Sequence, residues 1–406
     1  MVNLNPRIFR AYDIRGIYGQ DFDVAFVMEM ANKIAVHLNA KKIVVARDVR
    51  PSSPIIEQKV IESLLEANVD IVSIGISTTP LFYYSTIVAD ADAGIMITAS
   101  HNPNEYNGLK VLRRDGILMN GEQLKVVYEN TELSIGQRGT LCKKDFSTKY
   151  AERIIEESKI QSLNTRVCID IPETEKPILE KIMQHVGIQI NDSTLHVEFD
   201  SDTDRIYFTE HGKRIPSEFI FMLLVENMGF KRVVHDFRFS RSIKQRLSER
   251  GIAVAVSHVG RFLVAQKMRE HNAEFGGEKS GHFFFRAFHY LEAPELVLLL
   301  ILDIVEKSGK TLSELVQGYR EYVQSEEISI PLLGEWDEIQ KRLKRKYKDG
   351  RHDMFDGVTI EYGDWWFNIR PSNTEPVLRL IVEAKTEDLF KEKLKEVQGV
   401  IAGIIK

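Results

Sequence analysis

The stretch Thr98-Ala99-Ser100-His101-Asn102-Pro103 follows an apolar run at 93–97, which predicts a buried strand. The residue before a proline avoids the helical region, so the chain bends at Asn102. Ser100 is therefore expected on a loop at the carboxyl end of a strand, where open α/β sheets hold their ligands. No Gly-x-Ser-x-Gly elbow surrounds this serine, so its hydroxyl is a candidate carrier of a phosphoryl group. Taken alone, the hexapeptide leaves an ordinary turn as the alternative.

Strands and helices alternate on the amino-terminal side of this loop. Residues 42–46 and 71–75 have the composition of strands, and a helix is expected between them. This alternation predicts a βαβ arrangement with parallel pairing. In the loop after the first of these strands, Arg47 and Arg50 are expected to pair with Asp48 and shape the loop rather than bind phosphate.

A lysine follows the serine loop in the segment Tyr106-Asn107-Gly108-Leu109-Lys110. Asn-Gly permits positive φ and predicts a tight turn, with a strand over 109–112. Such a turn would fold the strand back beside Ser100 and direct Lys110 toward it. A solvated lysine on a strand is the alternative.

Three aspartates come directly after another predicted strand, at 195–199. Asp200, Asp202 and Asp204 alternate with Ser201 and Thr203. On an extended strand they would stand about 6–7 Å apart, too far for one ion, so the segment must curl if it binds metal. The positions that an EF-hand needs as Gly and Glu are Arg205 and His211, which excludes that motif. All-oxygen ligands favour Mg²⁺ over zinc, and a plain acidic turn is the alternative.

Two later loops carry groups suited to a sugar phosphate. Gly276-Gly277-Glu278-Lys279-Ser280-Gly281-His282 offers a carboxylate and a hydroxyl of the kind that bind sugar hydroxyls, or it is a turn with a surface glutamate. Arg370-Pro371-Ser372-Asn373-Thr374 combines a guanidinium, two hydroxyls and an amide, which makes a strong anion-binding loop.

Composition limits the class of protein. The chain has 406 residues, 43% of them hydrophobic, a net charge of −5 and two cysteines without metal-ligand spacing. It can build real cores, has no general attraction for nucleic acid, and fits a reducing cytoplasm. No signal peptide and no membrane-spanning stretch is expected.

Together these loops resemble those of the α-D-phosphohexomutases, most closely the phosphomannomutase/phosphoglucomutase branch. The resemblance covers nearly the whole chain, in family order, and begins at Tyr12-Asp13-Ile14-Arg15-Gly16. It implies an α/β fold: three similar mixed-sheet α/β domains, the second shortened, and a C-terminal α+β domain around a central cleft. The expected ranges are 1–140 for the phosphoserine-loop domain, 141–228 for the metal-loop domain, 229–324 for the sugar-binding domain and 325–406 for the phosphate-binding domain.

The resemblance also implies the chemistry. Hexose 6-phosphates and 1-phosphates would interconvert through phosphorylated Ser100, Mg²⁺ and a hexose 1,6-bisphosphate. The implied catalytic residues are Ser100, Arg15, Lys110 and His282, and the implied metal ligands are Ser100, Asp200, Asp202 and Asp204. The implied substrate-binding residues are Tyr12, His101, Arg205, Arg238, Glu278, Ser280, Arg370, Ser372, Asn373 and Thr374. A monomer or homodimer acting on small hexose phosphates is expected, with no nucleic-acid or membrane partner.

Several residues depart from the family pattern. Arg261 stands where the family often has His, Ala265 where it often has Lys, and the metal loop lacks the usual glycines. Asn373 favours mannose or glucose over glucosamine phosphate, which leaves phosphomannomutase as the first expectation. Phosphoglucomutase, phosphoglucosamine mutase and a non-catalytic sugar-phosphate binding protein are the alternatives, and a phosphatase is a weaker one.

Overall fold

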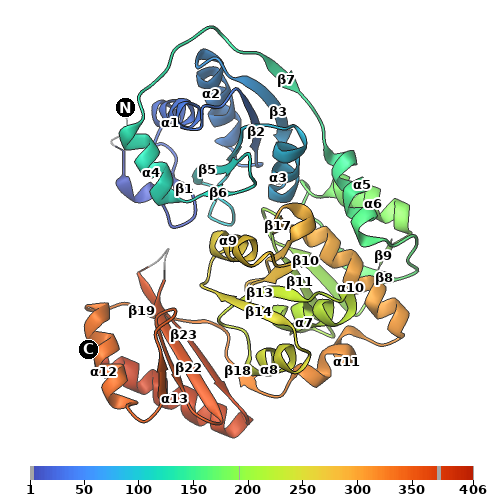
Figure 1. The fold of residues 1–406 in the computed structure, drawn as a ribbon, viewed down its shortest axis with the longest axis vertical. Helices are drawn as coiled ribbons and strands as arrows, with labels where there is room; N and C mark the ends of the chain where they lie inside the picture. Colours follow the sequence, from blue (N-terminus) through green and yellow to red (C-terminus); the bar gives the residue numbers. More distant parts are fainter. Residues whose placement is uncertain (1–3, 192, 373–375, 406) are drawn as a thin grey trace.

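The computed structural model describes residues 4–191, 193–372 and 376–405, and four β-sheets follow one another along this chain. Figure 1 shows the first and fourth sheets at opposite ends of the molecule, with the second and third between them. Among the described residues, no helix is both long enough and apolar enough to cross a bilayer.

The first sheet has seven strands in the order β1-β5-β4-β2-β3-β7, with β6 paired to β5. Its strands are β1 (Ile14–Ile17), β2 (Lys42–Arg47), β3 (Asp70–Ile76), β4 (Ala93–Ile97), β5 (Tyr106–Arg113), β6 (Leu118–Met119) and β7 (Leu141–Lys143). Its helices are η1 (Pro6–Ile8), α1 (Val24–His37), α2 (Ser53–Glu66), α3 (Thr79–Val88) and α4 (Gly121–Asn130).

The second and third sheets have five strands each, in the orders β12-β11-β10-β8-β9 and β14-β13-β15-β16-β17. The second unit contains α5 (Ser147–Ser158), β8 (Arg166–Asp170), α6 (Lys176–Val186), β9 (Gln189–Ile190), β10 (Leu195–Phe199), β11 (Ile206–Glu210), β12 (Lys213–Ile215) and α7 (Ser217–Met228). The third contains β13 (Arg232–Asp236), α8 (Arg241–Glu249), β14 (Ala253–Ser257), α9 (Arg261–His271), β15 (Phe275–Gly277), β16 (Phe283–Phe285), η2 (Arg286–Phe288), β17 (Leu291–Glu292), α10 (Pro294–Ser308), α11 (Leu312–Val316) and η3 (Gln317–Tyr319).

The fourth sheet is antiparallel, in the order β18-β23-β22-β21-β20, with β19 paired to β23. Its elements are β18 (Val323–Gln324), β19 (Ile328–Pro331), α12 (Trp336–Lys346), β20 (Arg351–Asp353), β21 (Val358–Glu361), β22 (Trp365–Pro371), β23 (Val377–Ala384) and α13 (Glu387–Ile404). Apolar side chains of α12 and α13 form one core with this sheet. This is the C-terminal α+β unit that the sequence predicts.

The first three sheets share one plan. In each, a central strand (β2, β8 or β13) has a parallel neighbour on both sides, and an antiparallel strand follows the second neighbour. Three loops therefore occupy equivalent positions, because each joins the last parallel strand to the antiparallel strand. They are the serine loop (98–105, between β4 and β5), the metal loop (200–205, between β10 and β11) and the sugar loop (278–282, between β15 and β16). Since carboxyl ends of parallel strands meet at one edge of a sheet, the shared plan places each loop at a ligand-binding edge.

The second unit is the shortened one. The helix that joins the two outer parallel strands is α3 in the first unit and α9 in the third, whereas β9 passes to β10 within 191–194. The strands of this sheet alternate between buried and partly exposed positions, as in β10 and β11. The solvent face carries pairs such as His196 with Asp170 and Arg214 with Glu198, which fits a face that no helix covers.

Some predicted elements differ from those observed. Asn107-Gly108 is not a turn but lies inside β5, and neither residue has positive φ. A Cβ on Gly108 would lie 1.8 Å from Ile14 O of the paired β1, so close strand pairing is the reason for this glycine. The sequence also predicts an apolar helix over 291–306, but residues 291–292 form β17 and the helix α10 begins at Pro294.

Two edge strands bear on the domain boundaries. β7 pairs with β3 of the first sheet, and β18 pairs with β23 of the fourth. We therefore propose to place the first boundary after Lys143 rather than at 140, and the last before Val323 rather than at 325.

Candidate active site

One cavity of about 530 Å³ gathers most of the predicted site residues. Its lining comes from all four units: Tyr12, Arg15, Ser100 and His101 from the first, Asp204 and Arg205 from the second, Arg238, Glu278, Ser280 and His282 from the third, and Arg370 and Ser372 from the fourth. Asn373 and Thr374 lie outside the described residues.

The serine loop is held in a specific shape by Arg50. Its guanidinium donates to the carbonyl oxygens of Ser100 at 2.5 Å, Asn102 at 2.6 Å and Pro103 at 2.5 Å, and Asp48 holds its Nε at 3.0 Å. Ser100 has φ of 55°, a left-handed conformation that is costly for a residue other than glycine. Arg50 pairs with Asp48 as the sequence predicts, whereas the side chain of Arg47 forms its ion pair with Glu57. The contacts of Arg50 with the serine loop are a feature that the sequence does not predict.

The hydroxyl of Ser100 meets the metal loop of the second unit. Ser100 Oγ donates to Asp202 Oδ2, and Lys110 Nζ lies 2.6 Å from the same oxygen and 3.4 Å from Asp204 Oδ2. Lys110 is buried, with Thr79 Oγ1 as a further partner at 3.2 Å, so it is not a solvated strand lysine. The serine, a cation and two carboxylates therefore form one buried group.

Each of the three aspartates has one buried oxygen without a hydrogen bond to any described residue, although cationic groups lie near two of them: Arg205 Nε is 3.5 Å from Asp200 Oδ2 and His282 Nε2 is 3.3 Å from Asp204 Oδ1. The loop is curled, with Thr203 at φ of 55°, and carboxylate oxygens of Asp200, Asp202 and Asp204 lie within 4.8 Å of one another. Asp200 Oδ2, Asp202 Oδ1 and Asp204 Oδ1 are buried without a hydrogen-bond partner among the described residues. Buried unsatisfied oxygens of this kind fit a small divalent cation with oxygen ligands.

Electrostatics agree with a missing positive charge. Burial, together with the charges of Asp204 and Asp202, raises the pKa of Asp200 to about 8. Lys110, His282 and Arg261 outweigh burial and hold the pKa of Asp204 well below its usual range. Nearby cations thus balance the negative charge of Asp204. Arg205, whose Nε lies 3.5 Å from Asp200 Oδ2, balances that of Asp200 only in part.

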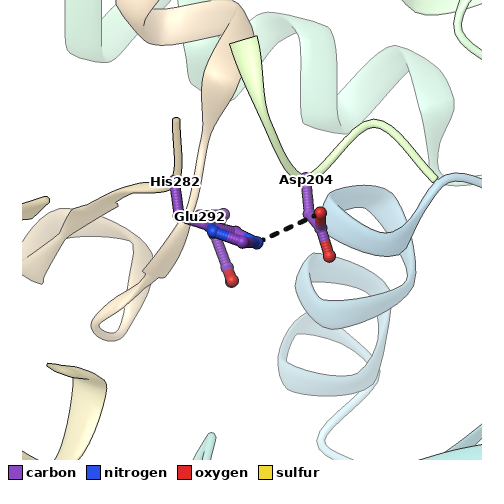
Figure 2. A group of neighbouring side chains, drawn as sticks. All are labelled: Asp204, His282 and Glu292. Carbon is purple, nitrogen blue, oxygen red and sulfur yellow. Dashed lines mark ion pairs between the residues drawn. The ribbon is translucent and has the colours of Figure 1, made fainter. Parts of the chain in front are cut away.

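A second group of possible ligands surrounds Asp204. Figure 2 shows Asp204 with His282, whose Nε2 lies 3.3 Å from Oδ1, and with Glu292. Arg261 already supplies a cation here, with Nη1 at 2.5 Å from Asp204 Oδ2 and 3.9 Å from Glu292 Oε1. We therefore assign this second group to ion pairing with Arg261.

The sugar loop is preorganised. Glu278 accepts a hydrogen bond from Gly260 N at 2.8 Å and pairs with His282 Nδ1 at 3.2 Å, while Ser280 Oγ lies 3.0 Å from the same nitrogen. Burial and Arg205 lower the pKa of His282, but Asp204 and Glu278 outweigh them and raise it to about 9. The imidazole is therefore charged at neutral pH and adds to the positive lining of the cavity.

Two charged residues that contact the predicted phosphate-binding arginines carry no sequence motif. Glu327 and Arg379 line the cavity beside Arg238 and Arg370. Arg379 follows the predicted anion-binding loop on β23, and its pairing with Arg370 in the hairpin is the only signal that would have placed it here. Nothing in the sequence distinguishes Glu327 from its neighbour Glu326.

The remaining predicted residues sit at the boundary of the serine loop. Arg15 pairs with Asp13 through Nη2 at 2.8 Å and donates to Asn102 Oδ1 at 3.1 Å. Tyr12 OH donates to Val259 O at 3.2 Å, which ties the first unit to the third. His101 is exposed next to Ser100.

Comparison with known proteins identifies this arrangement. The family models for phosphoglucomutase/phosphomannomutase alpha/beta/alpha domain I, domain III and the C-terminal domain match residues 6–134, 217–322 and 329–399. A phosphomannomutase of Methanocaldococcus jannaschii is 31% identical, with 97% of each chain covered. A probable phosphoglucosamine mutase of Pyrococcus horikoshii is 25% identical over 98% of this chain and 99% of its own.

Solved structures share the fold. A phosphoglucomutase/phosphomannomutase family protein of Burkholderia thailandensis is 23% identical with a TM-score of 0.86, covering 99% of this chain and 98% of its own. The chain belongs to the α-D-phosphohexomutase family. It is a phosphohexomutase, an enzyme of the isomerase class, which confirms the activity expected from its loops.

Proposed function

We propose that this enzyme interconverts mannose 6-phosphate and mannose 1-phosphate through a phosphorylated Ser100. The observation that carries the proposal is the position of Ser100 Oγ: it donates to Asp202 Oδ2, which Lys110 Nζ also contacts at 2.6 Å, and Ser100 lines the same cavity as Arg238 and Arg370. A sugar bisphosphate needs one phosphate at the reacting serine and the other among cationic side chains. A cavity lined by Ser100 and by these arginines supports both requirements.

The residues have separate roles in the transfer. The ester bond between Ser100 Oγ and phosphorus breaks as a bond forms from phosphorus to the sugar oxygen, and the reverse transfer follows after the bisphosphate turns over. The attacking hydroxyl loses a proton and the serine oxygen regains one. Lys110 contacts the same oxygen of Asp202 as Ser100 Oγ, so we assign the transfer of this proton to Lys110. Arg15 adds positive charge next to the serine loop.

The remaining residues hold the sugar. Glu278, Ser280 and His282 would bind hydroxyls that both orientations share, His101 and Tyr12 would border the reacting end, and Arg205 would support the metal loop. Arg238, Arg370 and Ser372, with Asn373 and Thr374, would bind the phosphate that is not reacting.

The carboxylate oxygens of Asp200, Asp202 and Asp204 that lack a hydrogen bond to another described residue would hold Mg²⁺, together with an oxygen on Ser100. When bound, the ion supplies positive charge beside the transferring phosphoryl group. Hexose 1,6-bisphosphate is the expected activator, since it can phosphorylate Ser100.

A second candidate substrate is glucosamine phosphate, because relatives named as probable phosphoglucosamine mutases match the chain at 25–26% identity. Mannose is preferred because relatives named phosphomannomutase reach 31%. A coupled assay with mannose, glucose and glucosamine phosphates, each with Mg²⁺ and bisphosphate, tests the choice. Turnover of glucosamine phosphate above mannose phosphate would overturn it.

A further inference from the structure

Glu327 lies among three arginines of the cavity lining, Arg238, Arg370 and Arg379, which we call the arginine grip. Glu327 Oε2 lies 3.2 Å from Arg238 Nη1 and 3.0 Å from Arg370 Nη2, and Glu327 Oε1 lies 3.7 Å from Arg379 Nε. The arginine side chains come from the third unit and from two strands of the fourth, and all four residues line the cavity. Glu327 is thus the shared anionic partner of the cationic end of the site.

The two arginines of the fourth sheet need this partner. Arg370 and Arg379 are direct cross-strand neighbours on the antiparallel pair β22 and β23, so their side chains leave the same face of the sheet. Like charges directly opposite one another destabilise a sheet. Glu327 relieves this repulsion by lying within ion-pair distance of both.

The charges around Glu327 match a phosphate. Arg238 has its own counter-charge in Asp236, which it binds through Nε at 3.1 Å and Nη2 at 2.8 Å. Arg370 pairs with Glu327 at 3.0 Å, so removal of this carboxylate would increase the net positive charge that faces the cavity. A phosphate dianion carries the complementary charge and oxygens suited to guanidinium groups.

Glu327 also has a distinctive place in the chain. It lies between β18 and β19, shortly after the strand by which the chain enters the fourth sheet from the third unit. A carboxylate in this segment that is exchanged for a ligand phosphate links occupancy of the grip to the connection between these units.

We infer that Glu327 is an internal substitute for the substrate's unreactive phosphate: it pairs with the arginine grip in the unliganded enzyme, and the phosphate binds by displacing it. The inference rests on the proposed function for the identity of the ligand. Its consequence is a weakened hold on either end of the bisphosphate, which must release the grip to turn over.

Binding of inorganic phosphate, measured by calorimetry on the full chain, tests this inference. E327Q removes the competing charge and is expected to bind phosphate about tenfold more tightly, because a full charge is lost beside the site. E326Q is the matched control: it removes the same charge one residue earlier, from an exposed side chain, and should leave affinity unchanged. In R370Q/E327Q the gain over R370Q should disappear.

A second measurement covers the case in which E327Q folds poorly. Glu327→Asp keeps the charge on a shorter side chain, and phosphate should raise its Tm more than that of the wild type. Equal or weaker phosphate binding by E327Q, or an equal gain in E326Q, would overturn the inference. Phosphate binding does not require turnover. If the variants bind phosphate as expected but the enzyme does not interconvert hexose phosphates, the proposed function is refuted and the inference about Glu327 stands.

Discussion

The hydroxyl of Ser100 donates to Asp202 at the candidate active site. Removal of this hydroxyl should therefore lower the catalytic rate and leave the fold intact. Ser100→Ala is expected to lower mutase turnover roughly a thousandfold or more, because no acceptor for the phosphoryl group remains. A coupled assay measures the loss, and circular dichroism checks that the fold is retained. Wild-type turnover in this variant would contradict the phosphoserine role.

Asp200 is the aspartate of the metal loop with a pKa raised to about 8, by burial and by its two acidic neighbours. Asp200→Asn should therefore raise the Tm in EDTA at neutral pH, by an amount equivalent to about 1 kcal/mol or more, because a carboxyl with this pKa must take up a proton on folding and the amide need not. Mg²⁺ should raise the Tm of the wild type and not that of the variant. Thermal scans with EDTA and with Mg²⁺ measure both effects, and an equal response to Mg²⁺ would exclude Asp200 as a ligand.

His235 is a buried neutral histidine away from the metal loop. Its ring stacks on Phe239 at 4.7 Å, and burial, with Lys244, lowers its pKa to about 4. The unfolded chain takes up a proton below about pH 6.5 and the folded chain does not until about pH 4. Stability that is present above pH 6.5 is therefore lost as the pH falls toward 4, by about 3 kcal/mol from this residue.

Urea unfolding between pH 7 and 4.5 measures this loss. His235→Gln should be less stable than the wild type at pH 7 and should lose less on acidification. His271→Gln, which changes an exposed histidine at the end of α9, should follow the wild-type curve. Parallel pH curves for the wild type and His235→Gln would show that His235 does not titrate as described.

At the scale of elements, the close approach of β1 and β5 places Arg15 beside the serine loop. Gly108→Ala would put a methyl group 1.8 Å from Ile14 O, so the strands must separate, at a cost of about 3 kcal/mol. Gly363→Ala adds a methyl group in open space and should be nearly neutral. Chemical denaturation compares the two, and equal stability would contradict the steric role of Gly108.

The elements also show what sequence patterns can and cannot predict. The strands expected at 42–46 and 71–75 lie within β2 and β3, because runs of β-branched and other apolar residues specify them locally. Asn107-Gly108 has the composition of a turn and lies in a strand, because the glycine serves contact with β1 rather than positive φ. Only the pairing of two segments about 90 residues apart reveals that purpose.

At the scale of the whole molecule, the loop at 258–260 joins three units. His258 stacks on Phe355 of the fourth unit at 4.1 Å, Val259 N donates to Asp356 Oδ2 at 3.2 Å, and Tyr12 of the first unit donates to Val259 O. This contact bridges the third and fourth units through residues other than Glu327. It should therefore hold the arginine grip at its working distance from Ser100.

Loss of this bridge should loosen the fourth unit. Phe355→Ala combined with Asp356→Asn is expected to increase the radius of gyration in small-angle scattering and to raise KM severalfold, because the phosphate grip is less often in place. Met354→Ala, at an exposed neighbour, is the control. An unchanged radius and KM in the double variant would show that the bridge has no such role.

The same scale explains which site residues could be foreseen. Ser100, Lys110 and the three aspartates lie in short motifs, and the structure brings them together. Glu327 lies in the plain segment Ser325-Glu326-Glu327, and Arg379 lies among the alternating residues of β23. The contacts of Glu327 with Arg379 and Arg238 depend on the register of two paired strands and on the packing of two units. A local sequence pattern predicts neither of these.

The missing helix of the second unit has a practical use. The link from β9 enters β10 at the end opposite the aspartates, about 16 Å away for five residues of extended strand. Its sheet face is already polar and open to water. A fluorescent reporter or an affinity tag spliced into this link should therefore be carried by the enzyme without loss of turnover, which makes it a natural attachment point for immobilising the catalyst.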